Sequence, residues 1–185
     1  MNLYMLRHAS AGTRRENPLL DVKRPLDRDG KHHCLRLAML LNSLKIQFDV
    51  IASSPLKRAL QTASMVGTEI GYDKQILLSN GLGPTATFAD FQKLLYELDS
   101  NESVLVVGHN PNLAGFVGQL LTPRSTRASA QVRLRKGSIA RLVTDRGNAQ
   151  LQALLDPRLI RALYSIPAKA GRRRAPRKKS PRSDR

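Results

Sequence analysis

The sequence predicts an α/β fold, a three-layer sandwich in which a mostly parallel central sheet carries helices on both faces. Two observations predict it. Short and nearly continuous apolar runs at 2–6 and 104–107 are typical of strands that are buried on both faces. Segments with helical spacing of apolar residues alternate with such runs as far as residue 121, which implies right-handed crossovers between parallel strands.

The elements follow one another along the chain in this alternation. We expect strands over 2–7, 48–53, 75–78, 103–108, 138–143 and 150–155. We expect helices over 30–45, 55–71, 88–99, 111–121 and 157–164. The last two strands, joined around 145–148, are predicted to form a hairpin. The stretch from Ser10 to Asp29 is long for a loop and follows the first strand, so we expect it to shape access to the sheet edge.

Individual residues give further expectations for three of these helices. Ser54 before Pro55, and Asn110 before Pro111, each indicate an N-cap followed by proline at the first helical position. In the helix over 30–45 the apolar stripe at 37, 41 and 44 should face the core, and the His-His-Cys run at 32–34 should be structural.

Polar side chains follow three of the predicted strands. His8 follows the first, Arg58 lies in the first turn of the helix after the second, and His109 follows the fourth. Ligands of open α/β sheets bind outside the carboxyl ends of the strands, so these residues should converge with Arg7 on one edge. Arginine forks and helix N-termini suit an anion such as phosphate, and the sequence therefore predicts a phosphate-handling enzyme.

No pattern in the sequence predicts a metal or a nucleotide cofactor. His32 and His33 are adjacent and diverge on a helix, and neither C-x-x-C nor H-E-x-x-H occurs. A Walker-type loop and a G-x-G-x-x-G fingerprint are missing as well. We therefore expect phosphate to be held by side chains and helix ends, without a cofactor or a metal.

Three motifs in this order resemble those of a known family. The residues are Arg7-His8-Ala9, the stretch from Ser54-Pro55 through Arg58-Ala59 to Gln61-Thr62-Ala63, and Gly108-His109-Asn110-Pro111. They resemble the histidine phosphatase (phosphoglycerate mutase-like) superfamily over about residues 2–155. The alanine after the first histidine, and Arg24-Pro25-Leu26 followed by Gly30, are most similar to the SixA-type phosphohistidine phosphatases.

The resemblance implies a mechanism with a covalent intermediate. His8 would be the nucleophile and would become phosphorylated, with its imidazole neutral at the attacking nitrogen. Arg7, Arg58 and His109 would bind phosphate and stabilise the transferring group, a task for which His109 serves best as a cation. Nearby positive charge should keep His8 unprotonated. Arg24 matches a further phosphate-holding arginine of the SixA pattern.

One departure from the wider superfamily favours phosphohistidine as substrate. Phosphomonoesterase and mutase members place a carboxylate proton donor where this chain has an acid-free stretch from Ser79 to Pro84, and the next acid is Asp90. An imidazole leaving group can take its proton from solvent, so it needs no positioned acid. Acids at 21, 27 and 29 in the long loop stay open as proton donors or as solvated charges.

Composition divides the chain into a domain over 1–165 and a basic tail over 166–185. The tail holds nine Lys or Arg against one acid, a net charge of +8 in a chain of +17, and we expect it to be disordered. It would make nonspecific contact with polyanions such as nucleic acid or acidic lipid, or serve only as a solubilising appendage. The single cysteine and the absence of a leader or membrane-spanning run predict a cytoplasmic protein.

Two classes of function follow. The first is a phosphatase that acts on phosphohistidine in a phosphorylated signalling protein such as a histidine phosphotransfer domain, with a small-molecule phosphomonoesterase or mutase as the alternative enzyme. The second is a non-catalytic module in which the pocket only captures phosphate or a polyanion. The complete set of Arg7, His8, Arg58 and His109 favours an enzyme.

Overall fold

A six-stranded sheet forms the centre of the molecule in a computed structural model, which describes residues 1–122, 130–145 and 148–164. The strand order is β3-β2-β4-β1-β5-β6. The strands are β1 (Asn2–Arg7), β2 (Val50–Ser53), β3 (Leu77–Leu78), β4 (Ser103–Gly108), β5 (Ile139–Asp145) and β6 (Asn148–Leu155). The first four in this chain order pair in parallel, and β5 and β6 add an antiparallel hairpin beside β1. The predicted α/β class and the terminal hairpin are confirmed.

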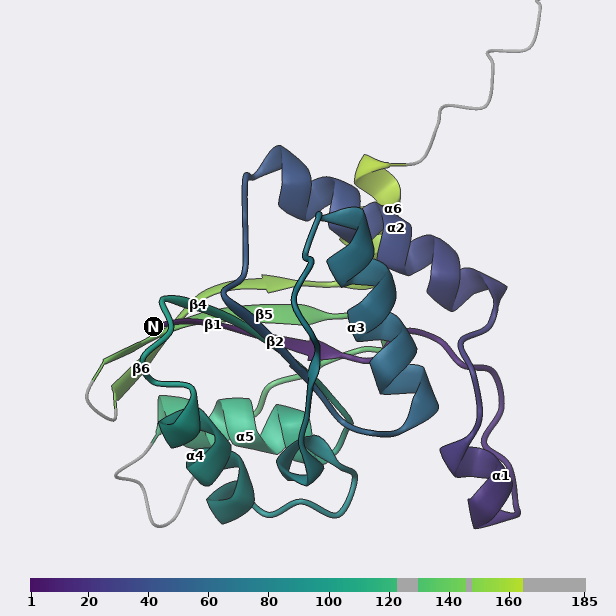
Figure 1. The fold of residues 1–185 in the computed structure, drawn as a ribbon, viewed down its shortest axis with the longest axis horizontal. Helices are drawn as coiled ribbons and strands as arrows, with labels where there is room; N and C mark the ends of the chain where they lie inside the picture. Colours follow the sequence, from purple (N-terminus) through teal and green to yellow (C-terminus); the bar gives the residue numbers. More distant parts are fainter. Residues whose placement is uncertain (123–129, 146–147, 165–185) are drawn as a thin grey trace, which may run out of the picture.

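Helices cover both faces of this sheet (Figure 1). They are α1 (Pro18–Val22), α2 (Arg28–Ser43), α3 (Lys57–Glu69), α4 (Phe88–Glu97), α5 (Asn112–Leu121) and α6 (Pro157–Leu163), with a 3₁₀ turn, η1 (Asn80–Leu82), before α4. The group α2, α3 and α6 lies on one face, and α4 and α5 lie on the other. Among the described residues, no helix is both long and apolar enough to span a bilayer.

Side chains that alternate along the strands divide the hydrophobic core into two clusters, one on each face of the sheet. Leu6 of β1 and Ile51 of β2 pack with α2, α3 and α6, whereas Leu3 and Met5 of β1 pack with α4 and α5. Successive side chains of a strand point to opposite faces, so a strand with helices on both sides must be apolar throughout. This double burial holds the carboxyl ends of β1, β2 and β4 in fixed positions.

Several expected boundaries differ from the structure. The long loop contains the short helix α1, of which no residue is buried, so no apolar periodicity signalled it. The strand expected over 75–78 is reduced to Leu77–Leu78, because the backbone N–H of Ile51 donates to the hydroxyl of Tyr72 (3.1 Å) in place of a strand partner. Leu44, expected in the core, is 56% exposed because α2 ends one residue before it.

Both predicted N-caps are wrong. α3 begins at Lys57 and α5 at Asn112, and neither has a side-chain cap. The Oγ of Ser54 lies 2.9 Å from Nε2 of His109, and the side-chain amide of Asn110 donates to the carbonyl of Leu134 (2.9 Å). These polar groups therefore serve the sheet edge rather than the helices. The predicted boundary at 165 and the tail over 166–185 lie outside the described residues, and so do 146–147 of the hairpin turn.

Candidate functional site

The carboxyl ends of β1, β2 and β4 bring two histidines together. Arg7 is in register with Gly108, so His8 and His109 leave neighbouring strands at the same level. The backbone N–H of His8 donates to the carbonyl of Gly108 (3.1 Å), and the two imidazole centroids are 5.0 Å apart. Both side chains are buried, at 5% and 3% exposure. The expected convergence at the sheet edge is present.

The hydrogen bond of His8 determines which of its nitrogens can act as a nucleophile. Nδ1 lies 2.8 Å from the carbonyl oxygen of Ala9. A carbonyl oxygen only accepts hydrogen bonds, so Nδ1 carries the proton. In the neutral ring Nε2 then has the free electron pair, and this nitrogen can attack phosphorus.

The surroundings of His8 keep its ring neutral. The pKa of His8 is lowered to about 3, mainly by desolvation on burial and also by the charges of Arg58 and Arg7, against the opposing effect of the Ala9 carbonyl. Loss of solvation disfavours the charged form of an imidazole, and so does a neighbouring positive charge. The predicted direction of the pKa shift is confirmed.

The surroundings of His109 also favour its neutral form, in contrast to the expected cation. Burial lowers its pKa to about 3, with further contributions from Arg58 and Arg7. The Oγ of Ser54 lies 2.9 Å from Nε2 of His109 and also accepts from the backbone N–H of Leu56 (3.3 Å). When this hydroxyl donates to Nε2, the proton of the neutral ring is on Nδ1. Neutral His109 therefore offers an Nδ1–H donor, and Ser54 is a positioning residue that the sequence did not reveal.

Three buried nitrogens of the site have no hydrogen-bond partner within the described part of the chain. They are Nε of Arg7, Nε of Arg58 and Nδ1 of His109. Other nitrogens hold the two arginines in place: Nη1 of Arg7 donates to the carbonyl of Leu134 (2.9 Å), and Nη1 of Arg58 to that of Asp21 (3.1 Å). Buried donors are rarely left unpaired in proteins, so these three point to an anionic ligand.

Arg24 is placed differently from the other predicted phosphate ligands. Its Nε donates to the carboxylate of Asp21 (2.8 Å), and its Nη1 donates to the carbonyls of Ala11 (2.7 Å) and Gly12 (3.1 Å). Its charge contributes to lowering the pKa of both Arg58 and His109, so it lies within electrostatic reach of the site. In this structure Arg24 stabilises the loop after His8 through these hydrogen bonds.

The carboxylates near the site are ionised, and each one accepts hydrogen bonds or forms an ion pair. Asp21 lies 3.4 Å from Nη1 of Arg58, and its pKa is lowered, first by the backbone N–H of Arg15 and then by Arg24. Asp27 accepts from Ser10, Gly12 and Gly30, and hydrogen bonds from all three lower its pKa despite partial burial. A lowered carboxyl pKa opposes a role as proton donor at neutral pH.

Two other acids are also unsuited to donate a proton in the site. Asp90 forms an exposed capping box with Thr87 at the start of α4. Asp29 lines a different cavity, between α2 and α6. No carboxyl considered from the sequence is therefore both close to the two histidines and protonated at neutral pH.

Two polar residues of α3, Gln61 and Thr62, also support the site. Oγ1 of Thr62 accepts from the backbone N–H of Ala9 (3.1 Å) and donates to the carbonyl of Arg58 (2.7 Å). Oε1 of Gln61 accepts from the backbone N–H of Leu26 (2.8 Å). The first turns of α3 therefore tie the segment after His8 to Arg58.

Comparisons with known proteins identify the family. A family model described as histidine phosphatase superfamily (branch 1) matches residues 3–82. An uncharacterized protein of Picosynechococcus sp. is 30% identical over 162 residues, which cover 86% of this chain and 93% of that relative. This chain belongs to the histidine phosphatase superfamily. The family is one of phosphatases, which supports a hydrolase acting on phosphoryl groups.

Solved structures share the fold of this histidine phosphatase. The protein histidine phosphatase SixA, solved with tungstate, has a TM-score of 0.77 and 23% identity, and the match covers 86% of this chain and 99% of that one. The α-ribazole phosphatase of Shigella flexneri has a TM-score of 0.63 and 16% identity, with coverage of 85% and 97%. Structures of this fold thus include proteins named for different substrates.

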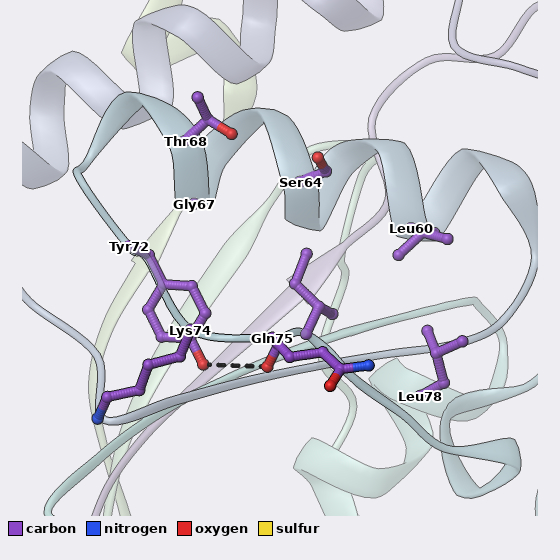
Figure 2. A pocket seen from close by; sticks show the side chains of 9 residues that line it. Leu60, Ser64, Gly67, Thr68, Tyr72, Lys74, Gln75 and Leu78 are labelled. Atoms are coloured by element: carbon purple, nitrogen blue, oxygen red, sulfur yellow. Dashed lines mark hydrogen bonds between the residues drawn. The ribbon is translucent and has the colours of Figure 1, made fainter.

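A cavity of about 350 Å³ lies apart from the two histidines. Figure 2 shows it between α3 and the chain from Tyr72 to Leu78. None of Arg7, His8, Arg58 and His109 lines it. Within the described residues, no group of three or more His, Cys, Asp or Glu side chains is arranged to hold a metal ion.

Proposed function

We propose that this protein is a phosphohistidine phosphatase that works through a covalent phosphoryl group on Nε2 of His8. The observation that carries the proposal is the meeting of one unprotonated imidazole nitrogen with three unpartnered buried donors, on Arg7, Arg58 and His109. A nucleophile and unpaired donors at one sheet edge suit the transfer of an anionic group.

The first step transfers the phosphoryl group to the enzyme. Nε2 of His8 forms a bond to phosphorus while the bond from phosphorus to the substrate imidazole breaks in line with it. The positive charge that develops on the His8 ring is stabilised by the Ala9 carbonyl, which accepts from Nδ1–H at 2.8 Å. The donors of Arg7, Arg58 and His109 bind the equatorial oxygens, and the leaving imidazole takes its proton from solvent at its other nitrogen.

The second step returns the enzyme to its starting state. Water attacks phosphorus, the bond to Nε2 of His8 breaks, and inorganic phosphate leaves. After its departure the donors of Arg7, Arg58 and His109 are unpaired again, as at the start.

The ionised carboxylates favour phosphohistidine over a phosphate ester. An alkoxide leaving group needs a proton from a positioned acid, whereas Asp21, the carboxylate beside Arg58, has a lowered pKa. An imidazole leaving group has no such need. We further propose that the substrate is a phosphorylated signalling protein, such as a histidine phosphotransfer domain, and that the protein is cytoplasmic.

A substrate panel without added metal tests this proposal. Phosphohistidine, a phosphorylated histidine phosphotransfer domain and a set of phosphomonoesters are compared by kcat/KM for the wild type and His8→Ala. We expect the two phosphohistidine substrates to be preferred, and turnover to be lost in His8→Ala. Preference for a phosphomonoester would make the protein a small-molecule phosphatase or mutase, and phosphate binding without turnover would make it a binding module.

A further inference from the structure

A second cavity, strongly basic, lies beside the candidate catalytic site. It has a volume of about 320 Å³ and is formed by α2, the segment at 135–136 and the start of α6, which packs against α2 on the same face of the sheet (Figure 1). Five cationic side chains line it, with a single acid, Asp29; the cations are Arg36, Arg135, Lys136, Arg158 and Arg161.

The charges of this cavity are only partly balanced within the protein. Arg135 pairs with Asp156 at 2.9 Å. In the part of the chain that the structure describes, Arg36, Lys136 and Arg158 take part in no ion pair. Like charges held around a common space repel one another, and an anion bound between them removes that repulsion.

The cavity is separate from the two histidines, but Gly137 connects its lining to their site. None of Arg7, His8, Arg58 and His109 lines it. The backbone N–H of Gly137 donates to the carbonyls of Arg7 (3.0 Å) and His8 (3.1 Å). His33, which lines the cavity, donates from Nε2 to the carbonyl of the same Gly137 (2.8 Å). The cavity therefore adjoins the phosphate site without contributing a ligand to it.

We propose that this cavity is a second anion site, which binds a compact polyphosphate, meaning two or more linked phosphoryl groups. Four of its five cations are arginines, whose planar forks bind phosphoryl oxygens in pairs. Its volume lies at the lower end of the range of about 300–1,000 Å³ that is usual for small-ligand sites. A concave cluster of charge suits a compact ligand better than a flat acidic protein surface.

Binding of inorganic triphosphate to the full-length protein tests the proposal. Calorimetry at fixed salt compares the wild type with Arg36→Ala/Arg158→Ala, which removes two cavity cations. The matched control is Lys74→Ala/Lys93→Ala, which removes two exposed cations elsewhere. Arg58→Ala alters only the catalytic site. We expect Kd to rise at least tenfold in the cavity pair, and less than threefold in the control pair and in Arg58→Ala.

Three results would overturn this assignment. Equal losses in the two pairs would mean that triphosphate responds to net charge alone, and loss confined to Arg58→Ala would mean that it occupies the catalytic site. Unchanged triphosphate binding in the cavity pair, together with a raised KM for a phosphorylated protein only, would make the cavity a docking surface for acidic side chains. Circular dichroism of each variant confirms that it is folded. Because binding is measured without turnover, failure of the proposed phosphatase activity leaves this test intact.

Discussion

Acid is expected to destabilise this protein through its two buried histidines. Burial lowers the pKa of His8 and of His109 from 6.5 to about 3. The unfolded chain therefore binds protons first as the pH falls. The stability that the two neutral rings contribute is fully present above pH 6.5 and is lost progressively between pH 6.5 and pH 3.

The size of the effect follows from the difference in proton binding between the two states. Between about pH 8 and about pH 5, each histidine removes about 2 kcal/mol from the free energy of unfolding, and the pair about 4 kcal/mol. Burial also lowers the pKa of His33, which acts in the same direction. The lowered pKa values of Asp21 and Asp27 contribute stability that is lost only as the pH falls below their ordinary value of 3.8. The carboxylates therefore add little in the same pH range.

Urea unfolding followed by circular dichroism at the two pH values measures this loss. The wild type should lose about 4 kcal/mol, a large share of the stability of a domain of about 5–15 kcal/mol. His109→Gln should lose about 2 kcal/mol, because glutamine takes up no proton. Saturating tungstate should reduce the loss, since a bound anion favours the protonated rings. A loss in His109→Gln equal to that of the wild type would refute the assignment of a neutral buried His109.

Three further changes have expected outcomes. Arg58→Ala should lower kcat about 10²–10³-fold and Arg58→Lys should recover little, because an ammonium group cannot replace a guanidinium fork; wild-type kcat in steady-state assays of Arg58→Ala would exclude a role in the site. Ser54→Ala should lower kcat on the order of tenfold and mix the tautomers of His109, which ¹⁵N NMR detects; a single unchanged tautomer would remove the positioning role. Truncation after Tyr164 should leave folding and small-substrate kcat intact while weakening salt-sensitive binding to DNA, and equal DNA binding by both forms would show that the tail recruits no polyanion.

The meeting of the two histidines at one sheet edge could be predicted from the sequence because strand ends determine it. His8 and His109 each come at the end of a strand that a short apolar run predicts, and parallel pairing of β1 with β4 brings them to one level. The parallel pairing of the first strands and the antiparallel hairpin of β5 and β6 were also predictable from the alternation along the chain, whereas the strand order was not. Burial on both faces of the sheet thus leaves a continuous apolar run in the sequence.

The polar details could not be predicted, because they depend on side chains that meet only in the folded chain. Ser54 before Pro55 has the local pattern of an N-cap, yet its hydroxyl reaches His109, 55 residues away. The charge of His109 depends on how deeply it is buried and on two arginines from other segments. α1 has no buried residue. Its Asp21 contacts Arg58, which lies 37 residues later in the sequence. Local propensity carries no information about such contacts.

The position of the phosphoryl group on the enzyme tests the central claim most directly. Wild-type protein is mixed with phosphohistidine substrate and quenched in denaturing alkali, where phosphohistidine survives, and the adduct is located by peptide mass spectrometry and ³¹P NMR. Nδ1 of His8 is occupied by its hydrogen bond to Ala9, so the phosphoryl group should be found on Nε2 of His8 and be absent from His8→Ala. A phosphoryl group on Nδ1, on His109 or on any other residue would contradict the mechanism.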